Sequence, residues 1–438
     1  MGFLSPARLG GICLAAALLL PASLLAHGAP PAGKEIFVLP HGDWVYVTNF
    51  GVLTEDSPLH YVCEEAFFGS DRFFVAPFAQ TKWSTFTRRQ IAKTSDGCDF
   101  EPVMDLPSAP TDVAMEQGTG LLSFALQDGD EARLWQSSDF GATFTELDVD
   151  LTGFRSTGLG YLSSSELILV GYDTGQENRG EAMLFLLELS SMELRPLEVD
   201  RELRFPNLLD ARDGYFLWHG RRGDQTEIYW SSGENLEVGY FETLRWPTAG
   251  ALRANGARAY LGGVDEEGRG VYSASLESPS VWEELLPGHR ALCMATTDQG
   301  LLLCGHRNHD DHDLLHFDEE NQALVLVDFR ELKGYRDDCP STSLVAQTCP
   351  AVWPETARAL SIALEPNSST PGDEHDDLPG LPGPAQNDEN EPRNEERSCR
   401  QGNSLLFTLA MFLLFYPTAF RPSTRGEEEP LLDCNGED

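Results

Sequence analysis

The strongest constraint on this chain is a repeat of short strand-like runs with a period near 42 residues. Hairpin starts at positions 54, 94, 137, 190, 231, 273 and 317 lie 40 to 53 residues apart. The runs are apolar and bounded by Gly, Asp, Asn or Ser, as in Glu166–Tyr172 and Gly300–Cys304, which is typical of β-strands joined by tight turns. A period of this length with four strands per unit predicts an all-β fold, a seven-bladed β-propeller. Six or eight blades are the alternatives, since only two or three repeats are well formed.

The predicted propeller occupies residues 35–364, more than 300 residues and enough for a substantial core. Its first repeat has too few residues before position 54 for four strands. We therefore expect the chain after about Ser341 to complete that blade and to tie the two ends of the ring together.

The clearest repeat unit is Ser137–Phe144, which reads SSDFGATF, and a shorter copy spans Thr94–Phe100. The first unit resembles the Asp-box, or BNR repeat, of sialidase-like propellers. In such a turn the Ser and Asp side chains accept hydrogen bonds from backbone amides, the Gly takes a conformation that other residues resist, and the aromatic ring inserts between sheets. These roles are structural. The residues assigned to them are Ser137, Asp139, Gly141, Phe144, Thr94, Asp96 and Gly97.

A second resemblance is carried by the segment Gly51–Phe100, through the strings GVLTED, YVCEEAF and TSDGC. It is similar to a group of exported Asp-box propellers from myxobacteria and related bacteria. In that group two cysteines lie in neighbouring hairpins. The resemblance implies the fold and an exported location, and it implies no activity.

Both ends of the chain lie outside the propeller. Residues 1–28 are typical of a secretory signal peptide, with Arg8 before the apolar run Leu9–Leu25 and small residues before the cut. Residues 365–398 are rich in Pro, Gly, Asn, Asp and Glu, which predicts a disordered acidic linker. Residues 399–425 hold the uncharged run Leu405–Phe420 and a basic flank, which predicts a short transmembrane anchor.

This C-terminal layout, with Cys399 before the apolar helix and arginines after it, resembles the sorting tails of myxobacteria. The resemblance implies display at the cell surface or outer envelope, either anchored or released by processing at Cys399. A plain membrane anchor is the alternative. The acidic tail 426–438 extends beyond the usual end of such a signal.

Six cysteines lie in the predicted propeller, and an exported protein can oxidise them. Connectivity does not follow from sequence alone. Our hypothesis pairs neighbours along the chain, each pair closing a short loop: Cys63 with Cys98, Cys293 with Cys304, and Cys339 with Cys349.

The chain carries 70 acidic and 31 basic residues, a net charge of −39, so nucleic acid is excluded as a partner. We expect no cofactor, and zinc and calcium are the candidate ions. Imidazole and carboxylate side chains suit zinc, and four histidines are interleaved with aspartates between the strands ending near Cys304 and starting near Leu314. The alternative is a solvated hairpin loop. The candidate ligands are His306, His309, His312 and His316.

No catalytic residues are predicted. The string Leu203–Pro206 is the nearest match to the arginine motif of sialidases, but it lies in the middle of the chain. We expect a monomeric, surface-displayed binding or scaffold module that recognises a protein or a glycan at the propeller face. A glycosidase or lyase with its site in the central channel is the alternative. A cluster of arginines with a Tyr–Glu pair at the channel mouth would favour the enzyme, and an apolar or simply acidic mouth would favour binding.

Overall fold

The computed structural model describes residues 32–362, and the signal peptide, linker, anchor and tail predicted above lie outside this range. Internal positions that it does not describe are 56–58, 68–72, 117–118, 176–179, 200–201, 233–234, 244–245, 254–257, 265–266, 277–280, 306–309, 311 and 319–321. Among the described residues there is no helix with the length and apolar character needed to cross a membrane.

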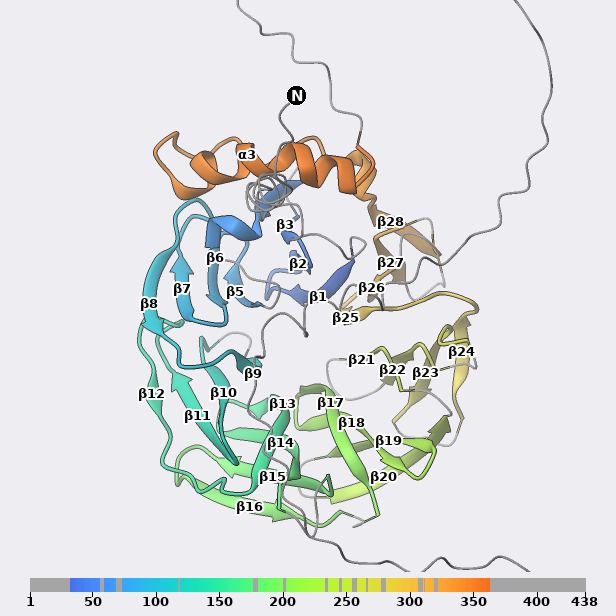
Figure 1. Cartoon of the computed structure of the whole chain (residues 1–438). Helices are drawn as coiled ribbons and strands as arrows, with labels where there is room; N and C mark the ends of the chain where they lie inside the picture. Colours follow the sequence, from blue (N-terminus) through green and yellow to red (C-terminus); the bar gives the residue numbers. More distant parts are fainter. Residues whose placement is uncertain are drawn as a thin grey trace, which may run out of the picture. The chain divides into compact units, whose positions relative to one another are not determined.

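The described residues form seven antiparallel sheets of four strands, arranged around a centre as the blades of a propeller (Figure 1). Each sheet consists of four strands that are consecutive in the chain. The predicted class and the predicted number of blades are therefore confirmed.

Every blade has the same order, with its first strand innermost. Blade 1 contains β1 (Gly33–Val38), β2 (Trp44–Thr48), β3 (Gly51–Thr54) and β4 (His60–Cys63). Blade 2 contains β5 (Phe74–Ala79), β6 (Lys82–Phe86), β7 (Gln90–Thr94) and β8 (Glu101–Asp105). Blade 3 contains β9 (Pro110–Met115), β10 (Leu122–Asp128), β11 (Glu131–Ser137) and β12 (Thr145–Glu146). Blade 4 contains β13 (Phe154–Ser163), β14 (Glu166–Asp173), β15 (Ala182–Glu188) and β16 (Glu193–Leu197).

The remaining elements complete the ring and follow it. Blade 5 contains β17 (Arg204–Arg212), β18 (Tyr215–Arg222), β19 (Gln225–Ser232) and β20 (Asn235–Thr243). Blade 6 contains β21 (Ala249–Leu252), β22 (Arg258–Gly262), β23 (Val271–Ser275) and β24 (Glu283–Leu286). Blade 7 contains β25 (Cys293–Thr297), β26 (Gly300–Cys304), β27 (Leu314–Asp318) and β28 (Ala323–Val327). Two short 3-10 helices, η2 (Glu64–Phe67) and η4 (Phe329–Glu331), and the helix α3 (Leu344–Ala359) lie outside the blades.

The core consists of apolar layers between neighbouring blades. Phe86 of blade 2 and Phe124 of blade 3 are fully buried, with ring centroids 5.5 Å apart. Successive strand residues point to opposite faces, so each sheet contributes side chains to two such layers. The innermost strands β1 and β25 also contact each other, which closes the ring between blades 7 and 1.

The turn between β11 and β12 has the hydrogen bonds expected from its sequence. Gly141 N donates to Ser137 Oγ (2.9 Å), and Thr143 N donates to an Asp139 carboxylate oxygen (2.8 Å). Gly141 has a φ of 75°, and a Cβ there would lie 2.2 Å from Ser84 Oγ. Phe144 packs against Phe86 and Phe124, with centroids 6.0 Å and 5.2 Å away, so the ring lies between blades 2 and 3.

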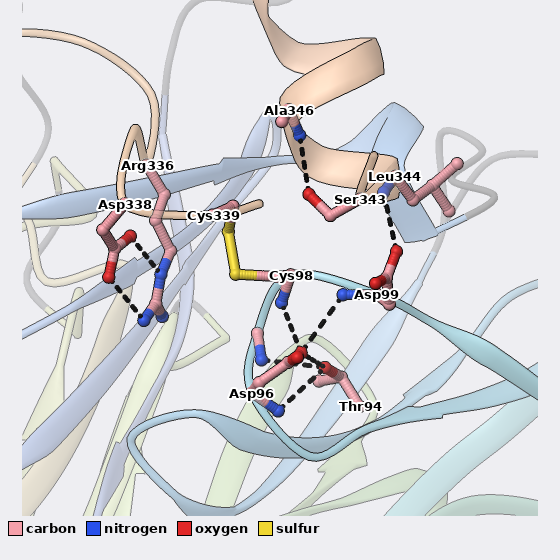
Figure 2. Close-up of a disulfide and its surroundings, with 11 residues drawn as sticks. Thr94, Asp96, Cys98, Asp99, Arg336, Asp338, Cys339, Ser343, Leu344 and Ala346 are labelled. Carbon is pink, nitrogen blue, oxygen red and sulfur yellow. Dashed lines mark hydrogen bonds and ion pairs between the residues drawn. A yellow bond between two sulfur atoms is a disulfide. The ribbon is translucent and has the colours of Figure 1, made fainter. Parts of the chain in front are cut away.

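The shorter copy of this turn, between β7 and β8, has a similar set of bonds (Figure 2). Gly97 N donates to Thr94 Oγ1 (2.8 Å), and Cys98 N donates to Asp96 Oδ1 (2.8 Å). The Asp96 carboxylate also accepts from Asp99 N (3.2 Å). The side chains of Thr94 and Asp96 therefore hold the backbone of Gly97 and Cys98.

Our expectation for ring closure was wrong. Blade 1 takes all four strands from residues before position 64, and the chain after Ser341 adds none. That segment instead forms α3, which begins at the N-cap Ser343, whose side chain accepts from Ala346 N (3.2 Å). The helix packs against β4, the outermost strand of blade 1.

The cysteine pairing hypothesis is correct for one pair and wrong for two. Cys293 and Cys304 face each other on β25 and β26 and form a disulfide. The other disulfides join Cys63 to Cys349 and Cys98 to Cys339, and Figure 2 shows the second of these. The physical reason is the path of the C-terminal segment, which returns from blade 7 across blade 1 to blade 2. Leu344 N donates to Asp99 Oδ1 (2.8 Å) at the end of that path.

Candidate functional site

Three carboxylates belong to innermost strands at the centre of the ring: Glu35 on β1, Asp112 on β9 and Asp210 on β17. In each of these strands, the pairing with the second strand of the blade skips the residue directly before the acid. The skipped residues are Lys34, Thr111 and Leu209. A β-bulge of this kind re-aims the neighbouring side chains. Blades 1, 3 and 5 therefore present an acid at equivalent positions.

Two of these carboxylates are fixed by the following blade. Asp112 Oδ2 accepts a hydrogen bond from Leu159 N on β13 (2.6 Å). Asp210 Oδ2 accepts one from Leu252 N on β21 (2.7 Å). Each carboxylate also accepts from the amide of the next residue in its own strand, at 2.9 Å and 2.8 Å. These bonds join innermost strands of adjacent blades and hold the charges in place.

Blade 4 has the same bulge but no acid. Its equivalent position is Gly158, and a Cβ there would lie 2.3 Å from the Cβ of Leu208 in β17. Close packing of β13 against β17 therefore excludes a side chain from this position.

The three carboxylates interact electrostatically. The pKa of Glu35 is raised to about 8. Burial is the main cause, and the charges of Asp112 and Asp210 add to it. Burial also raises the pKa of Asp112 to about 7, against the opposite effect of the hydrogen bonds from Leu159 and Val113. Charges that raise the pKa of a carboxyl lie close to it, so the three side chains share one region. This region lies among the innermost strands of the ring, and we call it the Glu35–Asp112–Asp210 channel.

One arginine accompanies this channel. Arg212 Nε lies 3.2 Å from Asp210 Oδ2, and its Nη1 donates to Thr296 Oγ1 (2.9 Å). Arg212 thus links β17 to β25 and partly compensates a single carboxylate.

A Tyr–Glu–Arg cluster does occur, in blade 5, but its geometry is structural. Tyr229 Oη donates to Glu227, and Arg222 Nε pairs with the same carboxylate at 2.6 Å. Both Tyr229 and Glu227 are on β19, the third strand of the blade. Burial, followed by Glu227, holds the pKa of Tyr229 well above its usual range. A phenol in this environment resists the ionisation that a nucleophile needs.

The string Leu203–Pro206, which is the nearest match to a sialidase arginine motif, lies at the start of blade 5. Arg204 begins β17 and pairs with Glu181 at 3.4 Å, at the boundary with blade 4. Phe205 next to it has a φ of 47° and is exposed.

Two of the four predicted histidine ligands lie in described regions. His312 is buried before β27, and its ring lies 5.6 Å from that of His289. His316 is within β27, opposite Leu302. His306 and His309 lie outside the described residues. In the part of the chain that the structure describes, no three His, Cys, Asp or Glu side chains are grouped to hold a metal ion. Zinc or calcium binding stays a prediction.

The channel carboxylates were missed at the level of sequence. The available signal was an acid inside an otherwise apolar first strand, as in GKEIFV and PTDVAM. Two such strings among 70 acidic residues do not stand out until the strand register is known.

Comparisons with known proteins do not place the chain in a family. No family model matches it, and no curated protein matches it in sequence. Among solved structures, a nidogen/laminin complex is 12% identical, with a TM-score of 0.38, over 56% of this chain and 92% of that one. The RRP9 WD40 repeats are 12% identical, with a TM-score of 0.47, over 65% and 90%. A GH74 xyloglucanase from Xanthomonas campestris is 14% identical, with a TM-score of 0.36, over 68% and 61%. Similarity at this level carries no inference about ligand or activity.

Proposed function

We propose that this propeller is a non-enzymatic, surface-displayed binding module whose ligand, a protein or a glycan, docks at the end of the Glu35–Asp112–Asp210 channel. Disulfides are consistent with the exported location. A rigid ring with loops from every blade converging on its channel is a suitable platform for recognition.

The acidity of the channel is the observation that carries this proposal. Three carboxylates from alternate blades face one region, and Arg212 pairs with Asp210 alone among them. When its carboxyls are ionised, which for Glu35 requires a pH above about 8, such a channel repels carboxylated sugars and attracts a cationic group, such as an amine of an amino sugar or a basic side chain. An acidic channel favours a binding module, whereas a sialidase-type reaction would need a cluster of arginines.

A glycosidase or lyase is the second candidate, and one observation favours it. Glu35 has a raised pKa beside two further carboxyl groups. A protonated carboxyl near a second carboxylate is the arrangement that general acid catalysis of glycoside cleavage requires.

The experiment that separates the two is a glycan array that includes neutral, anionic and amino sugars, with a product assay for every sugar that binds. Binding of amino sugars or cationic probes without product supports the binding module. Release of product would replace it with the enzyme. A blank array combined with no binding of basic peptides would refute the channel as the docking site.

A further inference from the structure

The outermost strand of blade 7 is an exposed apolar edge. Strand β28 reads ALVLV and has no charged residue and no proline. It pairs with β27 through one edge and lies on the outer rim of its blade (Figure 1). Leu324 is 60% exposed and Val325 is 52% exposed. An open, apolar strand edge is a template for pairing with another extended chain.

The other outermost strands in the described residues each have a feature that discourages such pairing. Strand β4 is covered by α3. Strand β12 has only two residues, Thr145 and Glu146. The remaining four carry charged residues, and two of these also contain proline: β8 is EPVMD, β16 is ELRPL, β20 is NLEVGYFET and β24 is EELL. Charges and prolines on an edge prevent unwanted strand addition. Strand β28 lacks these charges and prolines, and its one irregularity, a bulge at Leu326, leaves residues 323–325 as a regular apolar edge.

We propose that β28 binds an extended segment of another protein, which adds to blade 7 as a further antiparallel or parallel strand. Charge determines which occupant fits. The chain has a net charge of −39, and β28 lies between Asp318 and the segment 328–331, in which Arg330 pairs with Asp328 and Glu331 adds a negative charge. A second copy would bring like charges together, whereas a strand with apolar residues between lysines or arginines is attracted. This rim surface is separate from the channel and does not depend on the function proposed above.

A short synthetic peptide of alternating valine and threonine, with lysines at both ends, is a direct probe of the full chain. We expect it to bind and to slow amide hydrogen exchange in Ala323–Val327. The same peptide with N-methyl groups on alternate amides keeps its charge and cannot form the ladder, so we expect it not to bind. Equal binding of both peptides, no binding of either, or protection of a different strand would overturn the proposal.

Neutral variants test the strand without changing the charge. We expect Leu324→Gln combined with Val325→Gln to weaken binding about tenfold, because cross-strand apolar pairs are lost. Val281→Gln is the matched control, since Val281 is 63% exposed but lies outside the strands. Unchanged affinity in the double variant would refute the site. A wild-type dimer that the double variant abolishes would replace the basic partner by a second copy.

Discussion

Cys98, in the turn between β7 and β8, is joined by a disulfide to Cys339, which lies 241 residues later in the chain. The disulfide from Cys63 to Cys349 spans 286 residues. Both fix the segment after the last blade to the first two blades. Arg336 N, in this segment, donates to Tyr61 O on β4 (2.8 Å). Disulfides therefore hold the two ends of the ring together, a role that the sequence predicted for a strand shared between the ends of the chain.

Removing both long disulfides should loosen the ring at the junction of blades 7 and 1. Cross-links that close long loops restrict the unfolded chain most, and each is worth ~4 kcal/mol. We expect a chain with serine at Cys63, Cys98, Cys339 and Cys349 to show faster amide hydrogen exchange in β1 and β25. Strand β13, on the other side of the ring, should change least.

The Cys293→Ser, Cys304→Ser variant is the control for this experiment. It removes a disulfide within blade 7 whose loop spans 11 residues, and it leaves both long cross-links in place. If this variant loosens β1 as much as the loss of the two long disulfides, closure does not depend on the C-terminal segment.

The Ser137–Phe144 turn gives a second prediction. Asp139→Ala removes hydrogen bonds to Thr143 N (2.8 Å) and Thr143 Oγ1 (2.7 Å), so we expect a loss of ~1 kcal/mol in the free energy of unfolding. The hydrogen bond from the Thr143 side chain is the main reason that the Asp139 pKa falls to about 2. The benefit of Asp139 is therefore present above its ordinary value of 3.8 and is lost as the pH falls toward 2.

Denaturant unfolding at pH 7 and at pH 3 measures both effects of Asp139. Asp148→Ala, an exposed acid after β12, controls for the loss of one charge. A difference between wild type and Asp139→Ala that does not narrow at low pH would argue against the hydrogen-bonded carboxylate as its cause.

The fold was predictable because its signals are local. A turn such as Ser137–Phe144 forms from neighbouring residues, and the strand period needs no knowledge of distant contacts. Helix α3 was not predictable in this way, because Pro350 and Pro354 lie inside it and interrupt its pattern. The path of that helix, which brings Cys349 to Cys63, is a tertiary property.

The candidate site was less predictable for a related reason. Glu35, Asp112 and Asp210 are far apart in sequence and become equivalent only through a one-residue shift in three strand pairs. A bulge is not visible in composition or periodicity. By contrast, the histidine segment was conspicuous in sequence, and the described part of it places His316 within β27, a strand that the sequence expected to start near Leu314.

The raised pKa of Glu35 predicts how stability depends on pH. Its value moves from 4.5 to about 8, so the folded state binds a proton that the unfolded state has released in this range. The contribution of Glu35 is present in full below pH 4.5 and is lost as the pH rises through 8. We expect Glu35→Gln to match wild type at pH 5 and to melt ~4 °C higher at pH 9, an effect of the size that modest destabilisation has in a large domain.

Thermal unfolding from pH 5 to pH 9 measures this difference. Glu131→Gln, an exposed position in the hairpin between β10 and β11, controls for the removal of one charge. Parallel curves for wild type and Glu35→Gln across the range would show that Glu35 has no raised pKa.

A cation bound in the channel would lower the raised pKa of Glu35, because it stabilises the ionised carboxylate. Binding of spermidine, a small polyamine, favours the ionised forms of Glu35 and Asp112, whose pKa values are about 8 and about 7. We therefore expect its affinity to rise by about tenfold between pH 6 and pH 8, a range in which its amines stay protonated, with proton release from the carboxyls on binding. Isothermal titration calorimetry in buffers of different ionisation enthalpy measures both. The Glu35→Gln, Asp112→Asn variant should bind weakly with no pH dependence, whereas Glu131→Gln should behave as wild type. Spermidine binding that is unaffected by the channel variant would locate the polyamine on the general acidic surface and exclude the channel as a cation site.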